Sequence, residues 1–281
     1  MSIKIITDST TELSPKEAKE LDVAVIPLKT LFGEKEYLDG IDFTPEQFYT
    51  KLAQSDVLPT TSQPSPAEFE QFYREAQADG SQIIVICLAA SISGTYQSAN
   101  IAKETCGGDI RIIDSGTATV GLQILVRRAI GLRNEGKTAD EIVAIIEEEK
   151  KSVCVFAAID TLEYLYKGGR LSRTSAFAGT LLSIKPLISL SQGELKAIGK
   201  CKGQSKAYHE IFKLVEAAGG IDYSKPFGIG YTGDRSQFER FEQMCEPYFA
   251  GKKPIIGNIG SVIGTHIGPG AAAIVFFKNP S

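Results

Sequence analysis

Short apolar runs alternate with amphipathic segments along most of the chain. Several of these runs are continuous and rich in β-branched residues, which is typical of strands buried on both faces of a sheet. The pattern predicts strands at Ile3–Ile6, Val23–Pro27, Ile83–Leu88, Ile110–Ile113, Val153–Ile159, Leu187–Leu190, Phe227–Tyr231, Ile255–Ile259 and Ala272–Phe277. Because strands and helices alternate, we expect an α/β protein.

The starts of four helices can be read from capping boxes, in which Ser or Thr is followed three residues later by Glu or Gln. The four boxes are Ser14–Glu17, Thr44–Gln47, Ser65–Glu68 and Thr138–Glu141. The first three also have proline at the first helical position, where its missing N–H costs nothing. A further long helix is predicted over residues 117–135, with an apolar face that includes Leu122, Leu125 and Ala129.

A domain boundary is expected near residues 160–175, where the segment Lys167–Ser172 interrupts the apolar pattern. The length of the chain also suits two domains. We therefore expect an N-terminal α/β domain with a mostly parallel sheet over residues 1–160 and a C-terminal α/β domain over residues 161–281. The diglycine in this segment also fits the end of a short helix over 160–167, with Gly168 as a left-handed C-cap, and Arg170 also fits an exposed surface position.

Composition narrows the classes of function. The net charge of −4 argues against nucleic acid, which requires a clustered basic surface. The apolar runs are far shorter than the roughly 20 residues of a membrane-spanning helix, and the first residues do not have the layout of a signal peptide. We therefore expect a cytoplasmic protein whose five cysteines are reduced, and their spacing lacks the CxxC pairs of a zinc site.

Two glycine-rich segments match phosphate-binding patterns but stand in the wrong context. Gly131–Thr138 fits GxxxxGK[ST], yet it follows a predicted helix, where the phosphate loop requires a preceding strand. Gly264–Gly270, written GTHIGPG, leads into a strand, so a bound pyrophosphate would lack the dipole of a following helix. We predict that the first segment is a helix end followed by a new cap and that the second is a tight turn.

Three polar segments remain as candidates for a binding site. Ser93 and Gly94 lie where a buried strand turns into a helix, a place where free N–H groups attract an anion. Thr61 and Ser62 are surplus hydroxyl residues before the cap at Ser65, and His266 fits a pH-sensitive donor beside an anion. Each segment also has a purely structural interpretation: Ser93 as a helix cap, Thr61 and Ser62 as an exposed loop, and GTHIGPG as a turn.

Three other polar positions receive weaker functional interpretations. Asp8 and Ser9, at the end of the first strand, are read as scaffolding, and His209 is read as a surface residue.

Ser93, Asp114 and His266 occur in the chain order of an α/β-hydrolase triad, so a serine hydrolase of acyl esters is the alternative function. The nucleophile elbow GxSxG is missing around Ser93, which counts against it.

Six segments together resemble the DegV family of bacterial fatty-acid-binding proteins. They are IKIITDST, TTSQPSPAEF, ISGTYQSA, DSGTATVGLQ, TLEYLYKGGRLS and GTHIGPGA, and they extend over nearly the whole chain in the order of the family. The resemblance implies two α/β domains with one long-chain fatty acid, such as palmitate or oleate, in a tunnel between them. It also implies a carrier subunit without a cofactor, whose bound carboxylate a separate ATP-dependent kinase converts to acyl phosphate for phospholipid synthesis.

Matched segment by segment, the resemblance implies that Thr61, Ser93 and His266 hold the carboxylate, with Ser62, Gly94 and Thr265 as neighbours. It places Arg170 at the tunnel mouth or facing the kinase.

One departure concerns Lys202 in the stretch Ile198–Gly203, where the family usually has an arginine followed by threonine. A lysine replaces a planar bidentate donor with a point charge, so the resemblance supports lipid binding more firmly than coupling to the kinase. A carboxylate or phosphate sensor without an acyl tunnel is a third interpretation.

Overall fold

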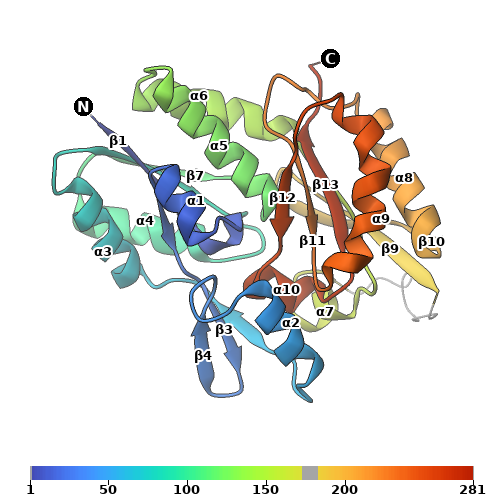
Figure 1. The fold of residues 1–281 in the computed structure, drawn as a ribbon. Coiled ribbons are helices and arrows are strands. Elements are labelled where there is room, and N and C mark those ends of the chain that lie inside the picture. Colours follow the sequence, from blue (N-terminus) through green and yellow to red (C-terminus); the bar gives the residue numbers. More distant parts are fainter. Residues whose placement is uncertain (1, 173–182, 281) are drawn as a thin grey trace.

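A parallel four-stranded sheet forms the first half of the protein, for which the computed structural model describes residues 2–172 and 183–280. Its strand order is β2–β1–β6–β7, and every neighbouring pair is parallel (Figure 1). The strands are β1 (Ile3–Asp8), β2 (Val23–Ile26), β6 (Gln82–Cys87) and β7 (Ile110–Asp114). All four lie where the apolar runs predicted strands.

Helices cover both faces of this sheet because successive strand residues point to opposite sides. Ile6, Ile83 and Val85 pack against α3 (Pro66–Gln77) and α4 (Thr95–Cys106). The alternate residues, Ile5, Ile84 and Ile86 among them, join a second cluster with the helices of the other face. Those helices are α1 (Pro15–Glu20), α5 (Val120–Asn134) and α6 (Ala139–Glu149). The continuous apolar strands are explained by this burial on both faces.

All four predicted capping boxes form. They begin α1, α2 (Pro45–Ala53), α3 and α6, and in each the Ser or Thr side chain accepts from the backbone N–H three residues on. The segment 131–138, which matches the phosphate-loop pattern, is a helix end followed by a new cap, as predicted. It spans the end of α5, a left-handed Gly136 and the cap of α6.

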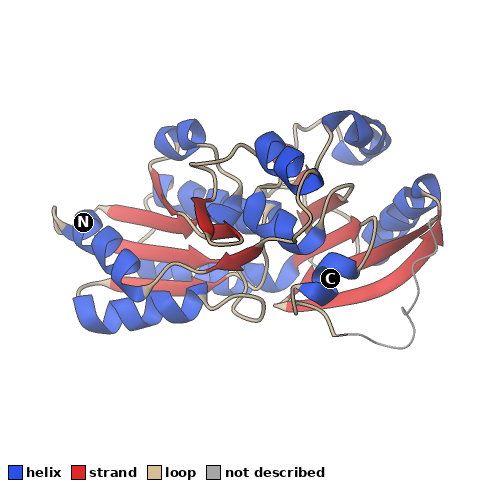
Figure 2. Ribbon diagram, turned by 90° about the horizontal axis from the view of Figure 1, so that it is seen from below, coloured by secondary structure: helices blue, strands red, loops and turns tan. Residues whose placement is uncertain are grey.

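A mixed six-stranded sheet organises the second half, in the order β10–β9–β8–β13–β11–β12. Its strands are β8 (Val153–Ala158), β9 (Ile184–Ser191), β10 (Glu194–Lys202), β11 (Gly228–Tyr231), β12 (Ile255–Asn258) and β13 (Ala272–Phe277). One face packs against α8 (Gln204–Ala217) and α9 (Arg235–Cys245). The strands of the two large sheets lie left and right in Figure 2. Strand β8 precedes residue 160 but joins the second sheet, so strand pairing crosses the predicted boundary between the domains. The division into domains 1–160 and 161–281 stays a prediction.

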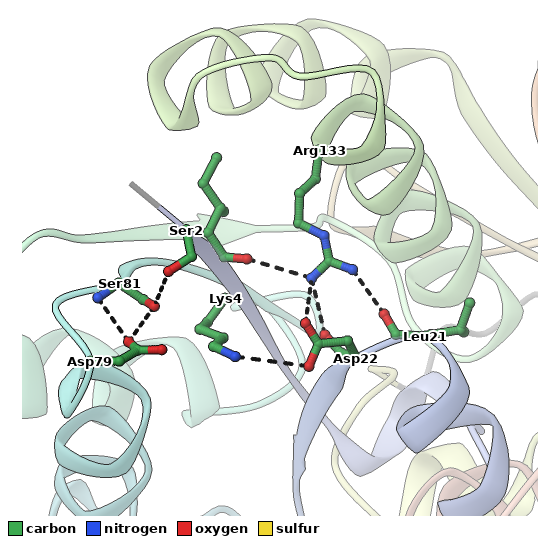
Figure 3. Close-up of polar contacts among 8 residues, drawn as sticks. Ser2, Lys4, Leu21, Asp22, Asp79, Ser81 and Arg133 are labelled. Carbon is green, nitrogen blue, oxygen red and sulfur yellow. Dashed lines mark hydrogen bonds and ion pairs between the residues drawn. The ribbon is translucent and has the colours of Figure 1, made fainter.

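Helix α5 links the two halves. Its residues share one apolar cluster with Ile5 and Ile84 of the parallel sheet and with Val275 and Phe277 of the second sheet. This position explains why most residues of α5 are buried, which is more than the single apolar face of the prediction. The far end of the helix is fixed by Arg133, whose guanidinium donates to the carbonyl oxygens of Leu21, Asp22 and Ile3 (Figure 3).

A small third sheet lies beside the junction of the two halves and has the order β4–β3–β5. Its strands are β3 (Lys29–Phe32), β4 (Lys35–Leu38) and β5 (Thr60–Ser62), and α2 packs beside it through Phe32 and Phe48. These three strands and β10 were not predicted. They are short or mix polar with apolar residues, so no buried run marks them. Among the described residues, 3₁₀ turns also form at η1 (Ser9–Thr11), η2 (Lys150–Ser152) and η4 (Glu246–Phe249).

Two short helices, α7 (Glu163–Lys167) and α10 (Ser261–Ile267), pack against each other near this junction. The prediction of a turn at GTHIGPG was wrong for its first four residues, because Gly264–Ile267 form the end of α10. Only Gly268–Gly270 form the turn that leads into β13. The predicted left-handed C-cap at Gly168 was also wrong. Gly168 has a helical φ of −76°, and the left-handed residue is Gly169, with φ of +71°.

Candidate functional site

A cavity of about 300 Å³ lies where the carboxyl edge of the parallel sheet meets the second sheet and α10. Most of its wall is aliphatic. The aliphatic wall consists of Leu28, Leu88, Ile92, Ala118, Val155, Ala157, Leu165, Ile188, Leu190, Leu195, Ile259, Val262, Ile263, Ile267, Ala271 and Ala273. Seven polar residues also line it: Thr61, Ser62, Gln63, Ser93, Thr119, Arg170 and His266. An apolar space with a few polar groups suits a ligand that has a long apolar part and a polar head.

His266 and Thr61 meet in this wall from distant parts of the chain. The Thr61 hydroxyl, on β5, lies 2.8 Å from Nε2 of His266, on the last turn of α10. The other ring nitrogen, Nδ1, is buried and has no hydrogen-bond partner among the described residues. Burial, reinforced by the nearby Arg170 charge, lowers the His266 pKa to about 4. The imidazole is therefore neutral at pH 7, and an anion placed beside it would favour its protonation.

Gly168 leaves the space that the imidazole occupies. A Cβ atom built on Gly168 would lie 2.2 Å from Nδ1 of His266 and 3.0 Å from Cε1. Since its backbone conformation is an ordinary helical one, this glycine is required by close approach rather than by φ. The first glycine of the diglycine thus sets the position of the histidine ring.

Ser93 and Gly94 form the turn into α4, as the sequence predicted. The Ser93 hydroxyl lies 2.9 Å from the Thr95 hydroxyl and also accepts, at 3.3 Å, from the Thr95 backbone N–H. Ser93 lines the cavity and bonds the first residue of α4, but the N-cap position belongs to Gly94 and no side-chain cap bond forms there, so the helix-cap interpretation of Ser93 was wrong. A Cβ on Gly94 would overlap the amide of Gln63 at 2.3 Å, so this glycine makes room for Gln63.

Arg170 lines the same cavity as Ser93 and His266. Its guanidinium donates to the carbonyl oxygens of Gly168, at 2.7 Å, and Ile92, at 3.1 Å. Burial lowers the pKa of this guanidinium. Arg170 forms no ion pair with a carboxylate of residues 2–172 or 183–280. A half-buried cation held by carbonyl groups makes the wall beside His266 attractive to an anion.

Three predicted site residues lie outside the cavity wall: Gly94, Thr265 and Lys202. The Thr265 hydroxyl is buried and donates to the Ser261 carbonyl oxygen within α10 at 2.8 Å. Lys202 ends β10 and borders a separate surface depression together with Lys206, His209 and Arg240. Conversely, the sequence prediction omitted Gln63 and Thr119, which line the cavity. The signal for Gln63 was present, because it follows Thr61 and Ser62 in a segment that already has its own helix cap.

The residues of the alternative hydrolase triad are not joined by hydrogen bonds. Nε2 of His266 contacts Thr61, its Nδ1 has no partner among the described residues, and the Ser93 hydroxyl contacts Thr95. Asp114 instead accepts from the backbone N–H groups of Ala90 and Gly116, both at 3.0 Å. In this arrangement Asp114 shapes two loops, and no base is held against Ser93.

Within residues 2–172 and 183–280, no group of three or more His, Cys, Asp or Glu side chains is arranged to hold a metal ion. Over the same residues, no helix has the length and apolar character required to cross a bilayer.

Comparison with known proteins identifies relatives over the full length. A family model described as an uncharacterised protein of the DegV family matches residues 2–279. A DegV domain-containing protein of Caldanaerobacter subterraneus is 36% identical over 98% of both chains, and one of Deinococcus radiodurans is 33% identical over 98% of both.

Solved structures agree with this assignment. A DegV family protein from Thermus thermophilus, described by its fatty acid binding, has a TM-score of 0.90 at 31% identity and covers 99% of this chain and 100% of its own. A fatty acid binding DegV family protein from Streptococcus agalactiae has a TM-score of 0.86 at 30% identity and covers both chains completely. With a matching model over nearly every residue and relatives above 30% identity, this chain belongs to the DegV family.

Proposed function

We propose that this protein is a carrier that binds one long-chain fatty acid in the cavity and presents its carboxylate to a separate ATP-dependent kinase, which forms acyl phosphate. The observation that supports this most directly is the cavity itself, which combines a long aliphatic wall with Thr61, Ser93, Arg170 and His266. Palmitate and oleate are the ligands expected in the cytoplasm for a carrier that serves phospholipid synthesis.

The head group requires these polar residues because a carboxylate leaving water is unstable unless it is hydrogen-bonded. On this proposal the hydroxyls of Thr61 and Ser93 donate to its oxygens, with Ser62 as a further hydroxyl nearby. His266 either donates through one ring nitrogen or becomes protonated, since the carboxylate offsets the burial that keeps it neutral. Gly94 and Thr265 act indirectly, the first by admitting Gln63 and the second within α10.

The tail supplies most of the affinity. Each buried methylene contributes about 0.8 kcal/mol, so a palmitate-sized chain contributes roughly 10 kcal/mol before the costs of ordering. Relatives from Thermus thermophilus and Streptococcus agalactiae with the same fold are described as fatty acid binding, which supports the same ligand here. On this proposal the chemistry belongs to the kinase, so the carrier needs no cofactor of its own.

Removing the hydroxyls of Thr61 and Ser93 should weaken binding without unfolding the protein. Native mass spectrometry of freshly purified protein should first show one bound long-chain fatty acid. Thr61→Ala and Ser93→Ala should then each raise the palmitate dissociation constant by roughly 10-fold to 100-fold, because a hydrogen bond to a charged group contributes about 1.5–3 kcal/mol. Titration calorimetry measures the change.

Thr50→Ala provides the matched control, because the Thr50 hydroxyl only bonds the Glu46 carbonyl on an exposed face of α2. It should bind palmitate as the unmodified protein does. A protein that carries no lipid and also fails to bind added palmitate or oleate would refute the proposed function.

Lys202 is proposed to face the kinase. It lies outside the cavity wall, beside Lys206 and Arg240, so Lys202→Ala should leave palmitate affinity unchanged. The rate of acyl-phosphate formation with a fatty-acid kinase and ATP should fall several-fold, because a cation is lost from the surface proposed to meet the kinase. Lys196→Ala is the control, since Lys196 is exposed on the same strand and pairs with Glu194. An equal loss in both variants would contradict a specific role for Lys202.

A further inference from the structure

Two acidic side chains from the first half of the chain converge on the start of α10. Oε2 of Glu12 accepts from the Gly260 N–H at 2.8 Å, and Oδ1 of Asp39 accepts from the Ser261 N–H at 2.9 Å. A Cβ on Gly260 would lie 3.0 Å from both acidic oxygens, so the two carboxyl groups flank one residue. Asp39 also accepts from the Ser261 hydroxyl at 2.7 Å.

This arrangement is costly for a purely structural contact. Neither acid forms an ion pair with a cation among residues 2–172 and 183–280. Burial first, and then the charges of Asp39 and Asp8, raise the pKa of Glu12 well above its usual range, and burial also raises the pKa of Asp8 to about 6. The buried Asp39 and the half-buried Glu12 accept from N–H groups at the start of α10, which have no partner within the helix itself.

The same helix is held closely along its length. Gly264 approaches α2 so tightly that a Cβ would lie 2.6 Å from Oη of Tyr49, which itself donates to the Ile259 carbonyl at 3.0 Å. The Thr30 hydroxyl lies 2.8 Å from that of Ser261. At the opposite end, His266 lies against Gly168. From Ser261 to His266 the helix rises only about 8 Å, so a displacement at its start reaches the imidazole.

We propose that Glu12 and Asp39 are positioning residues that fix the start of α10 and thereby hold the His266 ring against Thr61. Neither residue lines the cavity, so both act through the helix. The effect on fatty acid affinity rests on the proposed function, whereas the effect on His266 does not depend on it.

The test uses the small number of histidines. The chain has two, so a His209→Ala background leaves His266 as its single imidazole NMR signal, and the titration of this signal is followed without added lipid. In this background Asp39→Ala and Glu12→Ala should move the His266 pKa upward from about 4 toward its ordinary value, because the ring becomes less buried. Each should also raise the palmitate dissociation constant about tenfold or more.

Conservative variants separate positioning from general stability. Glu12→Gln keeps an acceptor for the Gly260 N–H and should leave the His266 titration and palmitate affinity near their original values. Glu141→Ala removes an exposed cap of α6 and should change neither readout. If Asp39→Ala fails to fold, Ser261→Ala removes the hydroxyl contacts with Asp39 and Thr30 but keeps the backbone bond to Asp39, and it should still shift the His266 signal.

An unchanged His266 titration in folded Asp39→Ala, Glu12→Ala and Ser261→Ala would overturn the proposal, as would an equal shift in Glu141→Ala. If the His266 signal shifts but neither the unmodified protein nor any variant binds a fatty acid, the result would support the positioning of His266 and refute the proposed ligand. The two proposals therefore fail in distinguishable ways.

Discussion

The double substitution Ala157→Ile/Ala273→Ile should lower palmitate affinity by roughly 200-fold or more, while the empty protein stays at least as stable as before. Ala157 and Ala273 are paired on the adjacent strands β8 and β13, and both line the cavity. The added side chains take the place of about four methylenes of the ligand, which costs about 3 kcal/mol of binding. Isoleucine suits a strand, and filling an empty apolar space tends to stabilise a protein.

A loss of palmitate affinity without a loss of stability would identify this cavity as the binding site of the acyl chain. Thermal unfolding of the lipid-free protein should show no decrease in melting temperature, whereas calorimetry with palmitate should show the loss of affinity of roughly 200-fold or more. Ala197→Ile is the matched control, because Ala197 lies on β10 of the same sheet but outside the cavity wall. Palmitate binding by the double variant at its original affinity would mean that the acyl chain occupies another part of the molecule.

Regular burial made much of the fold predictable from sequence. The strands of the parallel sheet are buried on both faces, so their apolar runs are unbroken, and the four capping boxes mark helices through local contacts alone. In contrast, β10 alternates exposed with partly buried residues at the edge of its sheet, and β5 is three residues long. Strand β5 pairs with β3, which is distant in sequence, so no local pattern reports it, whereas β10 follows its partner β9 directly and lacks only a continuous apolar run.

The site could be predicted only in part for the same reason. Ser93 and Thr61 stand out as hydroxyls at local turns, and the family resemblance connected them with His266. The reasons for Gly168 and Gly94 could not be found locally, because each glycine makes room for a side chain from a distant segment. The segment GTHIGPG was misread because its glycines indicated a turn, whereas Gly264 serves the close packing of α10 on α2.

Gly168→Ala should weaken palmitate binding by roughly 10-fold to 100-fold, about as much as the loss of a hydrogen bond to a charged group. The new methyl group would lie 2.2 Å from Nδ1 of His266, so the ring must move. Movement of the ring disrupts its 2.8 Å contact with the Thr61 hydroxyl and misplaces the donor for the carboxylate. Gly131→Ala is the control, because a Cβ there meets no atom within 4 Å and the residue lies inside a helix.

A double-mutant cycle determines whether Gly168 acts through the histidine ring. His266→Ala removes both the imidazole that donates to the carboxylate and the ring that a Cβ on residue 168 would overlap. Adding Gly168→Ala to it should therefore cause little further loss of affinity. The two effects are then strongly non-additive, as expected for groups in contact. Additive losses, measured by calorimetry with palmitate, would show that the alanine acts by another route, such as the carbonyl oxygen of Tyr164, which lies 3.0 Å from the same Cβ position. Non-additivity would connect the diglycine of the central segment with the histidine near the C-terminus as one binding element.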